Sequence, residues 1–398
     1  MGRLLIVSQV YPPDPTAVGQ YLADLAEGVA AGGRAVTVLT SASGYADPAQ
    51  RYPAREVLGG VEVIRLPASS FGKTSIATRL AGAASFLGQA LGRGARLGDV
   101  DRIFVSTSPP MAAGLGVALA RLKRVPLTYW VMDVNPDQAV EMGHFAPEHP
   151  AVRAFDMMNR AVLNRSEHVI ALDSFMAERL RRKIPRTVSV IPPWALDTHV
   201  SPVAHEDNRF RAEQGWSGRT VVMFSGNMSP TSPIDTVVDA AERLTDQPDL
   251  VFAFIGGGAG KSALEDRLRR RPMANVQLLP YQPIEMLRYS LSAADIHVVT
   301  MGEAMVGITH PCKIYSAMAV GRPLLAVAPE ESHVGELLKL GGGKRVDHGD
   351  VHGAVAAIRG LAEASADERT RLGRINLEAL SGPLAPGALR DRVAQLLG

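Results

Sequence analysis

The residues with the clearest chemical potential lie together between Gly307 and Arg322, in the sequence GITHPCKIYSAMAVGR. Lys313 supplies a cation, and Thr309, His310 and Ser316 supply polar groups near it. A lysine beside the free backbone N–H groups of a helix start is an arrangement that binds anions such as a diphosphate. A solvated lysine on an ordinary helix fits the same residues, so the pattern alone leaves both interpretations open.

The elements that position these residues follow from turn signals and hydrophobic spacing. Thr309 or His310 is predicted to cap a helix that runs to about Val320 and ends at Gly321. An apolar run at Leu324–Ala328 predicts the strand that follows it. The helix start should then present its N–H groups and the lysine at one place.

Length and composition indicate a two-domain globular protein. The chain has 398 residues, of which 46% are hydrophobic and 21% charged, and its net charge of +2 gives no general attraction to nucleic acid. Cys312 is the single cysteine, which excludes an internal disulfide and a cysteine-rich metal site. The first predicted strand begins at Arg3, and the apolar runs are shorter than the roughly 20 residues that span a bilayer. We therefore expect a cytoplasmic protein.

Strand and helix patterns alternate along the whole chain. They predict an α/β protein with two Rossmann-like, doubly wound parallel-sheet domains, residues 1–195 and 196–382, and a C-terminal helix at about 383–398 that packs back on the first domain. The stretch between the second strand and Val61 is rich in Gly, Pro and Ser and is expected to be an exposed, mobile loop. Ligands of such sheets bind at the carboxyl ends of the strands, so we expect the site in the cleft between the domains.

Two glycine-containing loops are poor matches to nucleotide-binding motifs. In GGGAGKS, Gly256 and Gly260 are separated by three residues rather than the four of a P-loop, so a tight turn into a helix is the better interpretation. The loop between Gln9 and Gly19 lacks the G-x-G-x-x-G of a dinucleotide site, which argues against a nicotinamide-dependent dehydrogenase.

The segment from Val63 to Gly98 contains no Asp or Glu and several basic residues. With its apolar residues it is predicted to form a basic, amphipathic helix pair, which would lie on an anionic membrane or pack on the domain with its arginines in water. The basic residues assigned to acceptor or membrane contact are Lys73, Arg79, Arg93 and Arg96.

At this point several stretches resemble glycosyltransferases of family 4, which have the GT-B fold. Residues 33–40 resemble the family's GHEVTVLT strand, Asn275–Val299 resembles the stretch that packs against the nucleotide base, and Ser316–Ala326 resembles EAMAxGxPVIA. The resemblance is greatest to bacterial O-antigen, capsule and exopolysaccharide transferases. That subgroup is indicated by SGN at Ser225–Asn227, IPPW at Ile191–Trp194 and HPCKIY at His310–Tyr315.

The resemblance implies a retaining transfer of a sugar from a nucleoside diphosphate sugar, with a UDP-sugar favoured. The acceptor would be a saccharide or a polyprenyl-linked saccharide in cell-surface polysaccharide or glycoconjugate biosynthesis, bound by the first domain. The nucleotide sugar, bound by the second domain, would be a co-substrate, with no other cofactor and no metal. Peripheral association with the inner face of the membrane would suit a lipid-linked acceptor.

The resemblance also assigns roles to individual residues. Lys313 would stabilise the leaving diphosphate, and Asp133, after the strand that ends near Met132, would orient the donor sugar or accept the acceptor's proton. Asn135, Asp137 and Glu141 would form a polar cluster behind Asp133, although a turn cap and a helix start fit these residues too. The donor-binding set is Gly19, Gly226, Asn227, Tyr281, Gln282, Glu303, Thr309, His310, Lys313 and Ser316.

The sequence departs from the family pattern at its acidic and basic positions. The two glutamates of the family are replaced by Ile308 and Ser316, and the usual basic pair gives way to Asn227 and a hydroxyl-rich run. Asp133 stands where many relatives have histidine. A nucleotide-sugar 2-epimerase, a catalytically impaired nucleotide-sugar-binding homologue and a non-catalytic two-domain binding module are the alternatives.

Overall fold

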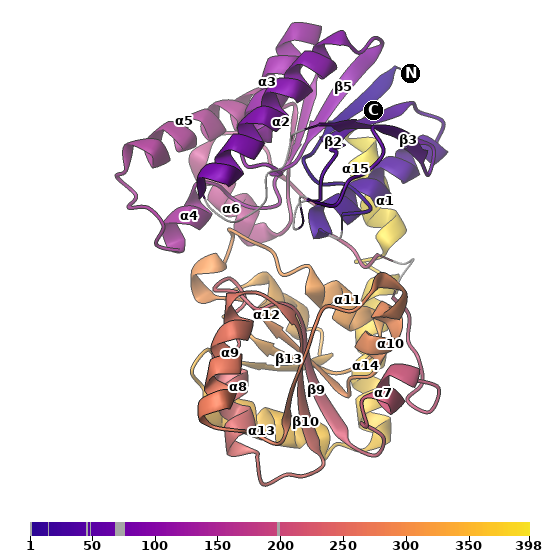
Figure 1. Ribbon diagram of the computed structural model, residues 1–398, viewed down its shortest axis with the longest axis vertical. Helices are drawn as coiled ribbons and strands as arrows, with labels where there is room; N and C mark the ends of the chain where they lie inside the picture. The colour runs from indigo at the N-terminus through magenta and orange to yellow at the C-terminus, as the bar shows by residue number, and fades with distance from the viewer. Residues whose placement is uncertain (1, 15, 45–46, 48, 68–75, 197–199) are drawn as a thin grey trace. The chain divides into compact units, whose positions relative to one another are not determined.

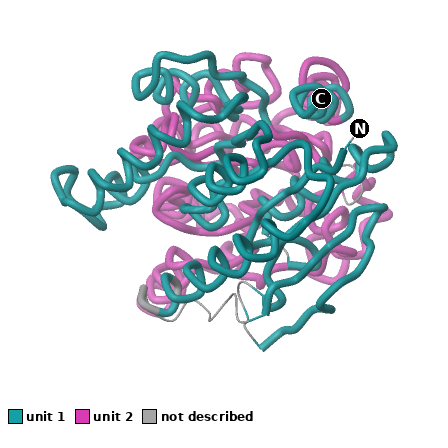
Figure 2. Tube along the Cα trace, turned by 90° about the horizontal axis from the view of Figure 1, so that it is seen from above, with its two compact units in different colours: residues 1–192, 387–398 teal, residues 193–386 magenta. Residues whose placement is uncertain are grey.

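The computed structural model describes residues 2–14, 16–44, 47, 49–67, 76–196 and 200–398. The chain divides into two compact α/β units, Met1–Pro192 with Gly387–Gly398, and Pro193–Pro386 (Figures 1 and 2). The last helix belongs to the first unit, where Arg390 Nη1 lies 3.2 Å from Asp24 Oδ1. Both units are Rossmann-like and doubly wound, so the predicted fold class is confirmed.

The first unit contains an eight-stranded sheet in the order β3-β4-β2-β1-β5-β6-β7-β8. Among the described strands the pairing is parallel except between β3 and β4. The central β1 is fully buried from Leu4 to Val7, as expected of a strand with helices on both faces. The strands are β1 (Arg3–Val7), β2 (Val36–Ser41), β3 (Arg55–Leu58), β4 (Val61–Leu66), β5 (Val100–Val105), β6 (Leu127–Trp130), β7 (His168–Ala171) and β8 (Ser189–Val190). The helices are α1 (Ala17–Ala31), α2 (Ile76–Arg96), α3 (Ala112–Lys123), α4 (Asp137–Glu141), α5 (Pro150–Arg165), α6 (Ser174–Lys183) and α15 (Pro386–Gln395).

The second unit contains a six-stranded parallel sheet in the order β11-β10-β9-β12-β13-β14. This is the doubly wound order 3-2-1-4-5-6, which reverses between β9 and β12. The strands are β9 (Thr220–Asn227), β10 (Leu250–Gly257), β11 (Val276–Leu279), β12 (Ile296–Thr300), β13 (Leu324–Val327) and β14 (Gly343–Val346). The helical elements are α7 (Arg209–Glu213), α8 (Asp235–Arg243), α9 (Ala259–Arg270), η1 (Ile284–Met286), α10 (Leu287–Ser292), η2 (Glu303–Met305), α11 (Lys313–Ala319), α12 (His333–Leu338), α13 (Val351–Ala362) and α14 (Ala366–Ser381).

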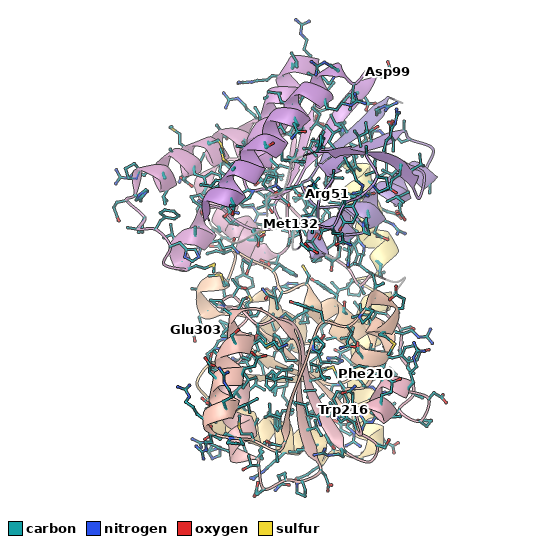
Figure 3. The ribbon with its side chains drawn as sticks, viewed as in Figure 1. Arg51, Asp99, Met132, Phe210, Trp216 and Glu303 are labelled. Carbon is teal, nitrogen blue, oxygen red and sulfur yellow. The ribbon has the colours of Figure 1, made fainter. Side chains whose placement is uncertain are left out.

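Two hydrophobic clusters cover the opposite faces of this sheet. Successive residues of β9 alternate between them, since Val222 and Phe224 join one cluster and Val221 and Met223 the other. Trp216 closes the second cluster, with its ring edge-on to that of Phe210 at 5.7 Å (Figure 3). The sheet is therefore fixed from both sides, and its strand ends are rigid places for a site.

Two predictions about the first unit were wrong. The expected loop after the second strand contains β3, which escaped notice because its side chains alternate between exposed and half-buried, with Val57 71% exposed. The expected helix pair is one described helix, α2. Arg65, at the start of that basic segment, is buried and hydrogen-bonded to Glu56 and to the carbonyl of Pro12.

None of the described helices combines the length and the hydropathy that a membrane crossing requires.

Candidate functional site

The carboxyl ends of β9 and β12 are neighbours at the point where the strand order of the second unit reverses. Doubly wound sheets bind their ligands at such a switch point. β9 ends in Ser225-Gly226-Asn227, and the segment after β12 leads through η2 to α11, which begins with Lys313. The stretch that looked most reactive in the sequence therefore lies next to the central strand.

Lys313 places its ammonium group over the end of β9. Its Nζ lies 4.0 Å from the ring centroid of Phe224, and a Cβ at Gly226 would lie 3.6 Å from Nζ. The residue as a whole is half-buried, but Nζ itself is enclosed and has no hydrogen-bond partner among the described residues. Burial lowers the pKa of Lys313 to about 7. An enclosed cation without a counter-charge is costly to the folded chain, and an anionic ligand would remove that cost.

Three glycines bring the carboxyl ends of β9 and β10 into close contact. Gly226, Gly256 and Gly258 have φ angles of +140°, +138° and +106°, which side chains other than glycine's rarely adopt. The N–H groups of Met228 and Gly260 donate to the carbonyls of Gly257 and Met228, at 2.7 and 3.0 Å. The turn after β10 thus leads directly into α9, which begins at Ala259, and the interpretation as a tight turn into a helix is confirmed.

We expect Gly256→Ala to destabilise the second unit by at least about 2 kcal/mol, because it combines backbone strain with a steric clash. A Cβ at Gly256 would lie 2.0 Å from the carbonyl oxygen of Gly226. Urea unfolding measures the change. The control is Gly360→Ala in α13, where a Cβ meets nothing within 4 Å and the free energy of unfolding should stay equal or rise. Equal stability of the two variants would contradict the contact between the turns.

The predicted cap of the helix was wrong. α11 begins at Lys313, and Cys312 takes the N-cap position with helical backbone angles and no side-chain cap. The N–H of Thr309 donates to the carbonyl of Met305 at 3.1 Å, so it is not available to a phosphate. The N–H groups of Cys312, Ile314 and Tyr315 are likewise engaged locally. The ammonium group of Lys313 is therefore the main feature that this segment offers an anion.

His310 belongs to a buried hydrogen-bond chain instead of capping the helix. Its Nε2 lies 2.9 Å from the hydroxyl of Tyr315, which lies 2.8 Å from Nε2 of His333. The hydroxyl has one proton, so it can donate to at most one of the two imidazoles. This chain fixes the loop before Lys313 and the start of α12 to the middle of α11.

The remaining predicted donor residues of the second unit lie near the strand ends. Tyr281 is 59% exposed after β11, and a Cβ at Gly257 would lie 3.1 Å from its ring, so one ring face is open to stacking. Gln282 donates its side-chain amide to the carbonyl of Pro280 at 2.9 Å. Asn227 and Glu303 are exposed (Figure 3 labels Glu303), and Ser316 is half-buried on α11. Their donor-binding roles stay predictions.

Asp133 follows β6 in the first unit, directly after Met132 (Figure 3). No hydrogen bond or ion pair of its carboxyl is found in the described part of the chain, and burial raises its pKa to about 6. The polar cluster expected behind it is partly structural, because Asp137 is paired with Arg179 and Lys183. The role of Asp133 in orienting the donor sugar or accepting a proton stays a prediction.

Gly19 does not lie in an open turn. It is buried inside α1, and its N–H donates to Thr16 Oγ1 at 3.3 Å. A Cβ there would lie 3.2 Å from the backbone of Tyr11. The absence of a side chain at Gly19 therefore lets the loop after β1 pack closely against α1. Contact between the backbone of Gly19 and a phosphate stays a prediction.

Among the basic residues assigned to a membrane or acceptor, Lys73 lies outside the described residues. Arg79 is on α2, but its side chain is not among those described. Arg93 and Arg96 are exposed in the last turn of α2, and Leu80 and Leu91 on the same helix are 62% and 40% exposed. No group of three or more His, Cys, Asp or Glu that could hold a metal ion is found in the described ranges.

Comparisons with known proteins agree with this architecture. Residues 16–194 match the family described as glycosyl transferase 4-like domain, and residues 219–364 match glycosyl transferases group 1. The chain belongs to the family 4-type glycosyltransferases. This glycosyltransferase is 28% identical to the probable glycosyltransferase WbjE of Pseudomonas aeruginosa, over 61% of each chain. It is 26% identical to WcaI of Escherichia coli, a putative colanic acid biosynthesis glycosyl transferase, over 90% of this chain and 91% of WcaI.

Solved structures show that the glycosyltransferase has the GT-B fold. Sucrose-phosphate synthase of Thermosynechococcus elongatus superposes with a TM-score of 0.78 at 20% identity, over 100% of this chain and 98% of that one. HepE of Anabaena, in complex with UDP and glucose, superposes with a TM-score of 0.73 at 16% identity, over 100% and 99%. At these identities the likeness concerns the fold alone.

Sequence reasoning about this glycosyltransferase missed two residues of the site. Phe224 lies two residues before Gly226 and therefore on the same face of β9, so the alternation of a strand could have placed it under the lysine. His333 lies 18 residues after Tyr315, beyond β13, and no spacing in the sequence predicts their contact.

Proposed function

We propose that the chain transfers a sugar from a nucleoside diphosphate sugar, a UDP-sugar in the first place, to a saccharide or lipid-linked acceptor with retention of configuration. The observation that carries this proposal is the enclosed, unpaired ammonium of Lys313 at the switch point of the second unit. Two relatives support it by what their names state, since WcaI is assigned to colanic acid biosynthesis and HepE was crystallised with UDP and glucose. The name of WcaI supports a role in cell-surface polysaccharide biosynthesis.

The proposed chemistry breaks the bond between C1 of the donor sugar and the diphosphate oxygen. That oxygen keeps the electron pair, and Lys313 stabilises the charge that develops on the diphosphate. The acceptor hydroxyl forms the new bond to C1 on the same face of the sugar. Its proton passes to a nearby base, for which Asp133 is our candidate.

The test is incubation of the protein with a UDP-sugar panel and a simple saccharide acceptor, followed by NMR of the product. We expect UDP release together with a new glycosidic bond of the same anomeric configuration as the donor. A product of inverted configuration would contradict retention. A new epimer of the donor, formed without acceptor, would instead indicate an epimerase.

A donor-binding chain without transferase activity is the second candidate. Ile308, which replaces one family glutamate, is 0% exposed and cannot serve as a ligand of the sugar. Ser316 replaces the other and is neutral. Binding of UDP-sugar without turnover on any acceptor would favour this candidate.

We propose that turnover needs no divalent metal, because the ammonium of Lys313 provides positive charge for the diphosphate. An excess of EDTA should leave the rate within about a factor of two of the untreated enzyme, since a change that small corresponds to less than 0.5 kcal/mol in the barrier. Loss of turnover on chelation, restored by Mg²⁺, would show the proposal to be wrong.

We propose that α2 contacts an anionic membrane surface, in keeping with a lipid-linked acceptor and a cytoplasmic location. The exposed Arg93 and Arg96 in the last turn of α2 support this. Replacing both arginines by glutamate should weaken binding to anionic liposomes by at least about 2 kcal/mol, roughly 30-fold, because each basic residue contributes about 1 kcal/mol near such a surface.

Liposome flotation measures this effect. The matched control is the double exchange of Arg153 and Arg165 for glutamate on α5, which makes the same charge change on exposed residues of the same unit. Equal flotation of the two double variants would remove the support for α2 as the membrane contact.

A further inference from the structure

A second basic site lies in the second unit, at the amino ends of the strands of its sheet. Asp295 and Pro323 directly precede β12 and β13, so they mark the amino ends of the strands, whereas Lys313 lies over the carboxyl end of β9. A pocket of ≈ 490 Å³ opens there between the chain at Pro202–His205 and α14. It is not part of the switch-point site, and nothing in the proposed transfer reaction uses it.

The walls of this pocket carry three arginines. Arg322 donates through Nη2 to the carbonyls of Val203 and Ser292, at 3.2 and 3.4 Å, while its enclosed Nε has no partner among the described residues. Arg369 donates through Nη1 to the carbonyls of Ala362 and Ala364. Both guanidinium groups are thus oriented by neutral oxygens, and no ion pair is found for either in the part of the chain described.

The third arginine, Arg374, is largely exposed. It has only a long contact of 3.9 Å to Glu378, which is itself 69% exposed, so the pair adds little stability. The pocket therefore presents guanidinium groups that the protein itself does not neutralise.

The acidic group in the pocket does not offset these charges. Asp295 accepts a hydrogen bond from Nη1 of Arg211 and one from the N–H of Val221, both at 2.9 Å. His205 lies 3.7 Å from its other oxygen. Burial lowers the pKa of Arg322, and the charge of Asp295 opposes this shift. The pocket is lined by three guanidinium groups and one carboxylate, so a net positive charge remains on its walls.

We propose that this pocket binds the phosphate group of a small soluble phosphomonoester. Planar guanidinium groups match two phosphate oxygens at once, and Arg322 and Arg369 are held in place by backbone carbonyls before the ligand arrives. Apolar walls from Val320, Pro323 and Leu377 provide contact for the organic part of such a molecule. The volume is in the range of ordinary small-molecule sites. This inference does not rest on the proposed transfer reaction.

The test is calorimetric titration with inorganic phosphate and with a hexose 6-phosphate, against sodium chloride at equal ionic strength. Every protein carries Lys313→Met, so that the switch-point site does not contribute its lysine. We expect both phosphates to bind, and Arg374→Glu to weaken binding by at least about tenfold. Arg371→Glu is the matched control, since it makes the same charge change on α14 but is paired with Glu368 and does not line the pocket. The dissociation constants of the Arg371→Glu variant for both phosphates should lie within about twofold of those of the Lys313→Met parent.

A second variant, Arg369→Gln, should weaken binding in the same direction without reversing a charge. Equal binding by all the variants, or no binding of either phosphate, would overturn the proposal. Vesicles that contain phosphatidic acid form a further arm. Binding to these vesicles with none to the soluble phosphates would assign the arginines to a lipid head group and would also overturn it.

Discussion

Lys313→Met is expected to lower kcat/KM by about 10²–10³-fold without lowering the free energy of unfolding. The loss of activity follows because a preorganised charge in an enclosed site contributes about 3–4 kcal/mol to the transition state. Stability should hold or rise because the variant replaces an unpaired, enclosed ammonium over Phe224 by an apolar side chain of similar length. A loss of activity without a loss of stability would separate a functional role of Lys313 from a structural one.

The pH dependence of stability gives the same variant a second signature. The folded pKa of Lys313 is about 7, below the unfolded value of about 10.4. Between these values the unfolded chain binds the proton and the folded chain does not, so wild-type stability rises with pH across this window. The advantage of Lys313→Met should therefore be largest below pH 7 and disappear as the pH approaches 10.

Lys261→Met is the control for both signatures. Lys261 is the lysine of the GGGAGKS turn, in contact with Glu265 at 3.8 Å, and it lies at the start of α9. We expect it to retain most of the activity. The account of Lys313 is contradicted if the two variants lose activity equally, or if Lys313→Met unfolds at lower urea concentration than the wild type.

Asp133→Asn is expected to lower kcat by about 10²–10⁴-fold, because the amide cannot accept the proton of the acceptor hydroxyl. The pKa of Asp133 is raised to about 6 by burial, so the wild-type carboxylate should lose activity as the pH falls through 6. This acid limb of the kcat/KM profile should be absent from the residual activity of the variant. Deprotonation of Lys313 should limit activity on the alkaline side from about pH 7 in the free enzyme.

The stability of Asp133→Asn should move in the opposite sense to its activity. The folded pKa of Asp133 lies above the unfolded value of about 3.9, so the folded chain holds the proton that the unfolded chain has lost between about pH 4 and 6. The contribution of Asp133 to the stability of the wild type therefore falls as the pH rises through this window. Above pH 6 the asparagine variant avoids the cost of the buried negative charge. Glu141→Gln, an exposed change in the same segment, is the control and should alter neither property. An unchanged acid limb in Asp133→Asn would exclude Asp133 as the base.

Much of the fold could be predicted because its strands are continuous apolar runs with turn residues on either side. β1 begins at the predicted residue, Arg3, and β13 (Leu324–Val327) lies within the predicted run Leu324–Ala328. β3 and β14 were missed because they are short edge strands with few buried side chains, so nothing in their local pattern separates them from loops. Edge position is decided by tertiary pairing, which a local pattern does not contain.

The candidate site was predictable in its residue types but not in its local geometry. Lys313 could be selected as a cation at a helix start, yet its enclosure depends on α11 packing over the end of β9, far away in the sequence. The capping prediction for Thr309 and His310 was wrong for a related reason. His310 gains more from the buried chain through Tyr315 to His333 than from a cap, and that chain forms only in the folded unit.

The central claim is that the second unit binds a nucleoside diphosphate through Lys313, and thermal unfolding with UDP, GDP, dTDP and ADP tests it most directly. A diphosphate at about 100 times its dissociation constant should stabilise the wild type by about 2.7 kcal/mol. We predict the largest rise in melting temperature with UDP, and no rise for Lys313→Met at the same concentration. Equal stabilisation of both proteins by UDP, or none of the wild type by any of the diphosphates, would contradict the claim.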